Sequence, residues 1–110
     1  AAHARKRMSM EKVKSYLDEN YKEHITLELL SQKFYINKYY LTKIFKETYG
    51  VTIISYLETR RITQAKNLLR FTDMTVDEIS AAIGMNDANY LARRFRKIEG
   101  MSPGEYRKKW

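Results

Sequence analysis

The chain has 110 residues, a length that suits one compact domain with its own hydrophobic core. It contains no cysteine, which excludes disulfides, thiolate zinc sites and cysteine nucleophiles. Its two histidines, His3 and His24, are too few and too far apart to suggest a metal cage. No apolar run approaches the roughly 20 residues of a membrane span, and no secretory signal is visible. We therefore expect a soluble, cytoplasmic protein without a metal or a cofactor.

Positive charge is concentrated in particular segments of the chain. Lys and Arg number 21 against 13 Asp and Glu, a net charge of +8, which favours a polyanionic partner. Segments 9–36 and 51–86 are nearly neutral. Segment 37–50 has three basic residues against one acidic, and segment 87–100 has four against two. Residues 1–8 and 101–110 carry the rest of the excess. The two internal basic segments are therefore the candidates for function.

Helical periodicity runs through the first half of the sequence. Residues 1–8 show no apolar period and are interpreted as a linker or tag remnant. A first helix is predicted from the cap Ser9 to about Lys22. Thr26 precedes a short second helix that ends near Phe34. Asn37 caps a third, which Gly50 ends. The inward positions predicted for the third helix are Leu41, Ile44, Phe45 and Thr48.

The second half repeats this layout after a long helix. A fourth helix of about 17 residues, predicted over about 53–70, spans roughly 25 Å. Thr75 starts a fifth helix that stops at Gly84, and Asn86 or Asp87 caps a sixth that ends at Gly100. Ser102 and Pro103 start a short final helix. The inward positions include Ile54, Leu57, Ile62, Ala65, Leu68 and Leu69 in the fourth helix and Leu91, Phe95 and Ile98 in the sixth.

The two halves align as an internal repeat. At offsets of 49 and then 50 residues, the matching pairs are Thr26/Thr75, Leu30/Ile79, Ser31/Ser80, Asn37/Asn86, Leu41/Leu91, Lys43/Arg93, Phe45/Phe95, Lys46/Arg96, Gly50/Gly100 and Tyr56/Tyr106. Each unit is a short helix, a turn and a longer helix, which is the helix-turn-helix layout. The first unit has Tyr35 where the second has Gly84, so its turn signal is weaker. We predict an all-α domain over 9–110 with about seven helices, in which helix-turn-helix subdomains 9–51 and 71–110 are joined by the linker helix.

The two basic segments are the second helices of the two units, 38–49 and 88–99, and this coincidence predicts DNA binding. Arg93 can donate two hydrogen bonds to guanine, Asn89 can read adenine, and Thr42 or Ala92 can contact a thymine methyl. Phosphate contacts, which add affinity without sequence information, are predicted for Lys38, Lys46, Arg96 and Lys97. Two units in one chain can occupy consecutive major grooves, roughly 34 Å apart, without a dimer.

At these residues the chain resembles the AraC/XylS family of bacterial transcription regulators, across about residues 9–109. The most specific matches are residues 83–97, IGMNDANYLARRFRK, residues 100–107, GMSPGEYR, and residues 40–46, YLTKIFK. Departures from the family pattern, at packing positions, are Ser31, Ser80, Met85 and Leu91. The resemblance implies base contacts from Tyr39, Thr42, Lys43, Ala88, Asn89, Ala92 and Arg93.

The resemblance also implies a setting for the domain. Such domains are usually the C-terminal part of a regulator whose other part receives a signal, and they commonly activate transcription by contacting RNA polymerase. The isolated domain is expected to be monomeric. No nucleophile, base and orienting partner can be assembled, so an enzyme is not predicted. The alternative is a protein-interaction module that contacts RNA polymerase with weak or no specific DNA binding. That alternative predicts apolar rather than basic exposed faces.

Overall fold

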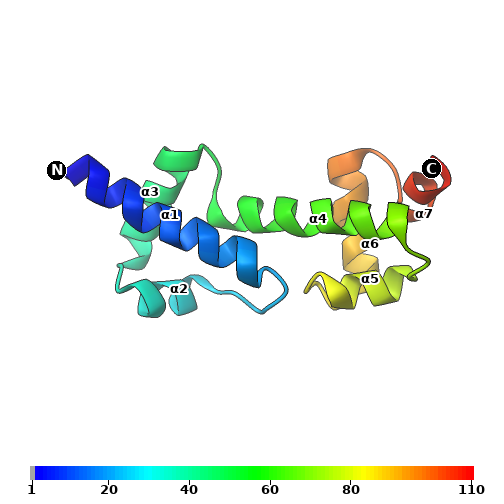
Figure 1. The fold of residues 1–110 in the computed structure, drawn as a ribbon, viewed down its shortest axis with the longest axis horizontal. Helices are drawn as coiled ribbons and strands as arrows, with labels where there is room; N and C mark the ends of the chain where they lie inside the picture. Colours follow the sequence, from blue (N-terminus) through cyan, green and yellow to red (C-terminus); the bar gives the residue numbers. More distant parts are fainter. Residues whose placement is uncertain (1) are drawn as a thin grey trace. The chain divides into compact units, whose positions relative to one another are not determined.

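The computed structural model describes residues 2–110, with side chains from Ser9 onward, and within this range it contains seven helices and no strand (Figure 1). The all-α prediction is confirmed. The chain divides into two compact units, one ending at Glu58 and the other starting at Thr59, so α4 contributes to both. The helices are α1 (Ala2–Asn20), α2 (Leu27–Phe34), α3 (Lys38–Tyr49), α4 (Ile53–Phe71), α5 (Val76–Ala82), α6 (Ala88–Glu99) and α7 (Pro103–Lys108).

The first helix begins earlier than its apolar pattern predicts. α1 runs from Ala2, so the expectation that residues 1–8 have no regular structure is wrong for residues 2–8, and Ser9 is not its cap. Alanine, arginine, lysine and methionine dominate this stretch, and all four have high helix propensity. Such residues extend a helix without needing an apolar face.

In the first unit, α1 and α2 pack against α3 and against each other (Figure 1). Phe45 of α3 is fully buried and meets the rings of Tyr49 and Tyr56, with centroids 4.8 and 5.8 Å away. Offset and edge-to-face ring contacts of this kind add to the stabilisation from area burial. The buried apolar side chains of this unit are Met10, Val13, Leu17, Tyr21, Leu30, Leu41, Ile44, Phe45, Ile53 and Leu57.

In the second unit, α6 packs against α5 and α7 (Figure 1). Phe95 occupies the position of Phe45, and its ring centroid lies 5.5 Å from that of Tyr106. The buried apolar side chains are Ile62, Ala65, Leu69, Ile79, Ile83, Leu91 and Phe95. Arg61, on the same helix as three of them, is partly buried, and this burial lowers the pKa of its guanidinium.

Three predicted inward positions are wrong. Thr48 is exposed, Ile98 is 40% exposed, and Ile54 is 72% exposed while its neighbour Ile53 is buried. Thr48 and Ile98 lie in the last turns of α3 and α6, where the residue that follows each of them is the one that packs: Tyr49 meets the Phe45 ring and Glu99 pairs with Lys66. Ile54 lies in the first turn of α4, where the helical phase sets Ile53 and Leu57, four residues apart, on one face. Apolar character alone did not determine which of two adjacent isoleucines faces inward.

The turns of the two helix-turn-helix units have left-handed residues at equivalent places. Tyr35 ends α2 with φ 55°, and its backbone N–H donates to the Ser31 carbonyl. Gly84 follows α5 with φ 86°. Glycine adopts this conformation without a steric penalty, whereas tyrosine does so at some cost in energy. The first unit therefore has a left-handed residue at the equivalent point of its turn in spite of its weaker sequence signal, while the turn of the second unit contains another, Asn86, with φ 55°.

Capping boxes begin α5 and α7. The hydroxyls of Thr75 and Ser102 accept hydrogen bonds from the backbone N–H groups of Glu78 and Glu105, and the carboxylates of those residues accept from the cap N–H groups in return. Each box satisfies two backbone donors that a helix start leaves unpaired.

In the part of the chain that the structure describes, no helix has the length and hydropathy to cross a bilayer.

These boxes make stability depend on pH. Backbone hydrogen bonds at the caps lower the pKa of Glu78 and Glu105 below 4.5. A pKa lowered by folding means that the ionised carboxylates stabilise the fold at neutral pH, and that this contribution is lost as the pH falls through the lowered pKa. We expect the melting temperature of the Glu78→Gln/Glu105→Gln variant to fall less steeply than that of the parent from about pH 5 to about pH 3.

Thermal melts followed by circular dichroism over this range measure the difference. Glutamine still accepts the cap hydrogen bond but does not titrate, so the double variant isolates the ionisation. The control is Glu19→Gln, at an exposed carboxylate of α1 outside any capping box, which should keep the parental slope. Parallel pH curves for the double variant and the parent would contradict this role of the caps.

Candidate nucleic-acid interface

The outer face of α3 consists of polar and aromatic side chains. The helix begins where the Asn37 side chain accepts hydrogen bonds from the N–H groups of Tyr39 and Tyr40, and it ends at Gly50. Because Leu41, Ile44 and Phe45 face the core, helical geometry turns the intervening positions outward. The predicted base-contacting residues of α3 are all exposed, and Tyr39 is 88% exposed. They are Tyr39, Thr42 and Lys43.

The outer face of α6 is more cationic than that of α3. Its cap is Asp87, whose carboxylate accepts from the Tyr90 N–H, so of the two predicted caps Asp87 is the correct one. Asn89 and Arg93 are exposed, one helical turn apart, whereas Ala88 and Ala92 are only partly exposed. The Arg93 guanidinium lies 5.9 Å from the centre of the Tyr90 ring. A guanidinium within about 6 Å of an aromatic face is weakly attracted to it.

All four predicted phosphate-contacting cations are exposed, but two of them are engaged within the protein. The Lys38 ammonium donates to a Glu28 carboxylate oxygen at 3.0 Å. This hydrogen bond is the main cause of the lowered pKa of Glu28. In the second unit, the Arg96 guanidinium lies 3.7 Å from a Glu105 carboxylate oxygen. The exposed cations Lys46 and Lys97 complete the set. Each face thus combines cations with a nearby carboxylate that sequence reasoning did not assign to it.

Each unit has a surface hollow beside the start of its second helix. The hollow of the first unit lies between α2 and α3 and has a mostly apolar wall formed by Leu27, Lys38, Tyr39, Thr42 and Lys43. The hollow of the second unit lies between α5 and α6 and has a mostly polar wall formed by Asp77, Ser80, Ala81, Asn86, Asp87, Ala88 and Asn89. Five of the seven predicted base-contacting residues therefore border these hollows, whereas Ala92 and Arg93 do not, and Leu27, which no sequence pattern assigned to the site, joins them.

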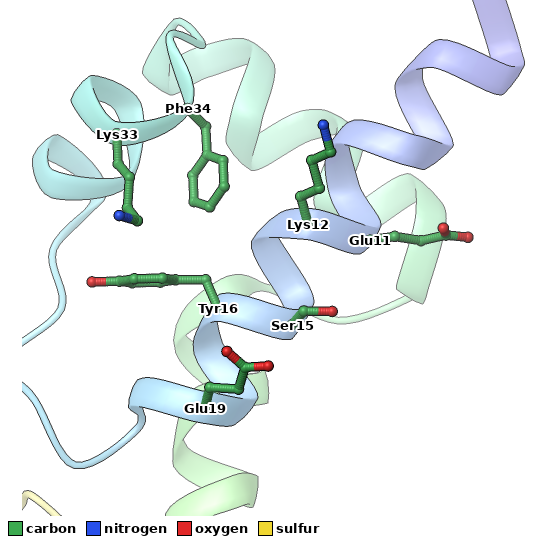
Figure 2. A pocket seen from close by; sticks show the side chains of 7 residues that line it. All are labelled: Glu11, Lys12, Ser15, Tyr16, Glu19, Lys33 and Phe34. Atoms are coloured by element: carbon green, nitrogen blue, oxygen red, sulfur yellow. The ribbon is translucent and has the colours of Figure 1, made fainter.

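A third hollow lies on the other side of α2, against α1 (Figure 2). Tyr16 packs edge-to-face on Phe34 with centroids 5.9 Å apart, and the Lys33 ammonium lies 4.9 Å from the Tyr16 ring. Figure 2 shows Glu11 and Glu19 on the α1 side. The carboxylates offset the lysines here, so this groove lacks the positive charge that a phosphate backbone requires.

Partly buried polar contacts join α4 to a neighbouring helix in each unit. In the first unit, the Tyr56 hydroxyl donates to Asp18, whose carboxylate also lies 3.5 Å from the Lys14 ammonium. Burial is the main cause of the raised pKa of Tyr56. In the second unit, the Lys66 ammonium lies 3.2 Å from Glu99, near the end of α6. These contacts fix α1 to α4 in one unit and α4 to α6 in the other.

The last helix is held by an arginine of the GMSPGEYR segment. The Arg107 guanidinium donates to the carbonyl oxygens of Leu69 and Thr72, at 2.9 and 3.2 Å. These carbonyls lie at and just after the end of α4, where helix carbonyls lack intrahelical partners. Arg107 therefore closes α7 onto α4 and, through Tyr106, supports Phe95. The Arg107 side chain donates to backbone oxygens inside the protein. Its role is therefore structural, unlike that of the exposed cations of α3 and α6.

The seven helices found over residues 2–110, with two second helices whose outer faces are exposed, define a double helix-turn-helix domain. The family described as a helix-turn-helix domain matches residues 30–109. The chain therefore belongs to this family, the AraC-type helix-turn-helix domains. The resemblance seen in the sequence is confirmed.

Relatives in bacteria share this domain. The chain is 37% identical, over 97% of its length, to the uncharacterized HTH-type transcriptional regulator YijO of Escherichia coli, of which it spans 38%. It is similar in structure to the C-terminal domain of AraT, a response regulator from Geobacillus stearothermophilus, with a TM-score of 0.90, 25% identity, and coverage of 93% of this chain and 85% of that one. The DNA-binding domain of AdpA, solved with a target DNA, gives a TM-score of 0.86 at 28% identity, covering 91% and 90%.

Proposed function

We propose that this domain binds double-stranded DNA sequence-specifically as part of a bacterial transcription regulator. One observation carries the proposal: the same two-helix unit occurs twice, and in both copies the second helix is anchored by a buried phenylalanine while its opposite face is cationic. A helix with a polar, cationic outer face suits the major groove. The complex of AdpA with its target DNA supports the assignment, since that domain has the same fold.

The division of roles follows from which side chains can donate or accept in a groove. Arg93 offers two parallel donors to guanine, and Asn89 matches the donor and acceptor of adenine. On α3, Tyr39, Thr42 and Lys43 are the exposed candidates for base contact. Ala88 and Ala92 can offer only apolar contact. α3 and α6 then occupy successive major grooves of one operator, roughly 34 Å apart.

The phosphate contacts come from Lys38, Lys46, Arg96 and Lys97, and they supply affinity for any sequence. In the full regulator a separate domain receives a signal, and the regulator activates transcription through contact with RNA polymerase. The domain itself binds as a monomer in the cytoplasm, with no cofactor, metal or catalytic activity of its own. The chain spans about a third of the length of its relatives, which leaves room for such a signal-receiving part.

The test is selection of bound sequences from a random duplex pool, followed by binding measurements over a range of salt concentrations. We expect two short motifs about one helical turn apart, and a slope of log K against log salt near −0.9 per phosphate contacted, which is steep for about six contacts. A pool that stays random, together with a flat salt response, would favour the interaction module that contacts RNA polymerase instead.

The Glu28 carboxylate should weaken DNA binding. It holds Lys38 at 3.0 Å and places a negative charge at the edge of the cationic face. We expect Glu28→Gln to tighten binding to specific and random duplexes alike by about two- to fivefold, the scale of an exposed ion pair. Fluorescence anisotropy with both duplexes measures this effect.

The matched control for this change is Glu19→Gln in α1, which makes the same change in net charge away from α3. It should alter affinity much less, because screening weakens interactions between distant exposed charges. Equal tightening by both variants would show that net charge matters rather than the Glu28–Lys38 pair.

A further inference from the structure

The hollow of the first unit has an unusual composition for a cationic face. Its wall includes Leu27, the first residue of α2, which is only partly buried and so contributes apolar surface outside the core. Tyr39 and Thr42, three residues apart on α3, add a ring and a methyl group to the same wall. Lys38 and Lys43 supply the positive charge. The hollow thus combines an apolar wall with cations.

The equivalent place in the second unit has different chemistry. Ala88 and Asn89 correspond to Lys38 and Tyr39 in the repeat, and both contribute to the hollow there. Its other polar residues include Asp77 and Asp87, whose carboxylates can accept but not donate hydrogen bonds. Ala92, which corresponds to Thr42, is not part of this wall. The two units therefore present different surfaces at equivalent positions beside their recognition helices.

We propose that the first unit recognises a thymine through its 5-methyl group, which lies in the hollow formed by Leu27, Tyr39 and Thr42. This proposal rests on the proposed function. Among base edges in the major groove, the thymine methyl is the one apolar feature, so an apolar wall on a DNA-facing surface matches it. Lys38 complements the phosphates that flank any such base, and Lys43, in the same wall, remains a candidate for contact with a neighbouring base. The site assigns the methyl contact to Thr42 rather than Ala92 and adds Leu27 as a specificity-determining residue.

The experiment replaces single thymines of the selected operator by deoxyuridine, which removes only the methyl group. One position in the motif read by the first unit should lose about three- to fivefold in affinity, the value of one buried methyl group. In the motif read by the second unit, deoxyuridine should cost less, because Ala88 and Ala92 offer single methyl groups without such an apolar wall, whereas 7-deazapurines, which lack the N7 acceptor, should weaken binding. The Arg93→Ala variant identifies which motif the second unit reads, because the variant should lose base preference within that motif only.

A double-mutant cycle connects the methyl group to the hollow. Leu27→Ala and Thr42→Ser each remove apolar wall atoms, and Thr42→Ser keeps the hydroxyl group. In both variants the cost of deoxyuridine at the sensitive position should fall towards zero, which a purely structural effect would not produce. Circular dichroism melts confirm that each variant is folded.

Two results would overturn the proposal in distinguishable ways. If the domain selects an operator but tolerates deoxyuridine at every thymine of the first motif, or if the cost persists in both variants, the methyl site is wrong and the proposed function stands. If no operator is selected at all, the proposed function fails and the methyl site fails with it.

Discussion

Phe95→Ala should lower the free energy of unfolding by about 3–5 kcal/mol, the usual cost of removing a fully buried phenylalanine. The side chain has no exposed surface and packs edge-to-face on Tyr106. Tyr106 belongs to the same helix as Arg107, which holds α7 to the end of α4. Removing the ring leaves a cavity between α6 and α7 and loosens the support of the α6 outer face. Urea denaturation measures the loss.

Two control variants make this result specific. Phe71→Ala removes the same atoms from a ring that is 70% exposed, and it should cost far less. Phe95→Leu refills most of the cavity and should recover much of the loss. Stability that is unaffected by Phe95→Ala, or that falls equally for Phe71→Ala, would show that Phe95 does not support the unit as its burial indicates.

Arg93→Ala should relax sequence preference at one base pair and cost about 1–3 kcal/mol on the specific operator, with a much smaller effect on random DNA. Arg93 is exposed on the outer face of α6, and its guanidinium lies 5.9 Å from the centre of the Tyr90 ring. A bidentate contact to guanine uses both of its parallel donors, so Arg93→Lys should not restore the preference. Binding titrations on operators with each base pair varied in turn measure the change.

The matched comparison is Lys97→Ala in the same helix, with Lys46→Ala as its counterpart in α3. Both are exposed cations assigned to phosphates, so each should weaken binding to all sequences alike and make the salt slope shallower by about one contact. Equal losses on specific and random duplexes for Arg93→Ala as well would remove the distinction between base and phosphate contacts.

Most of the fold could be predicted because strong local signals bound each helix. The caps Thr26, Asn37, Thr75 and Ser102 and the terminators Gly50 and Gly100 lie where predicted, and each makes the expected backbone hydrogen bonds or turn. The start of α1 could not be predicted from the spacing of apolar residues, because residues 2–8 show no such spacing. Their helix propensity is the only local signal for a helix there. Thr48 and Ile98 show a second limit, because in the last turns of α3 and α6 the neighbouring residues Tyr49 and Glu99 make the inward contacts instead.

The candidate site was predictable only where it depends on residues of a single helix. Helical phase alone sets Lys43 and Arg93 on the faces opposite Phe45 and Phe95, and the structure leaves them exposed. The contributions of Leu27 and Glu28 depend on how α2 packs beside α3, which no local pattern encodes. The packing of α2 beside α3 therefore adds two features to the site: the apolar wall that includes Leu27, and the Glu28 carboxylate that competes with phosphate for Lys38.

The two units have hollows of different composition, and this difference bears on the orientation in which the domain would bind an operator. Two identical subunits related by a twofold axis bind a palindrome and cannot distinguish its two directions. Under the proposed function, a single chain presents two different DNA-contacting surfaces in a fixed order, and its operator has a defined polarity. Inverting such an operator would then reverse the bound domain relative to the neighbouring DNA.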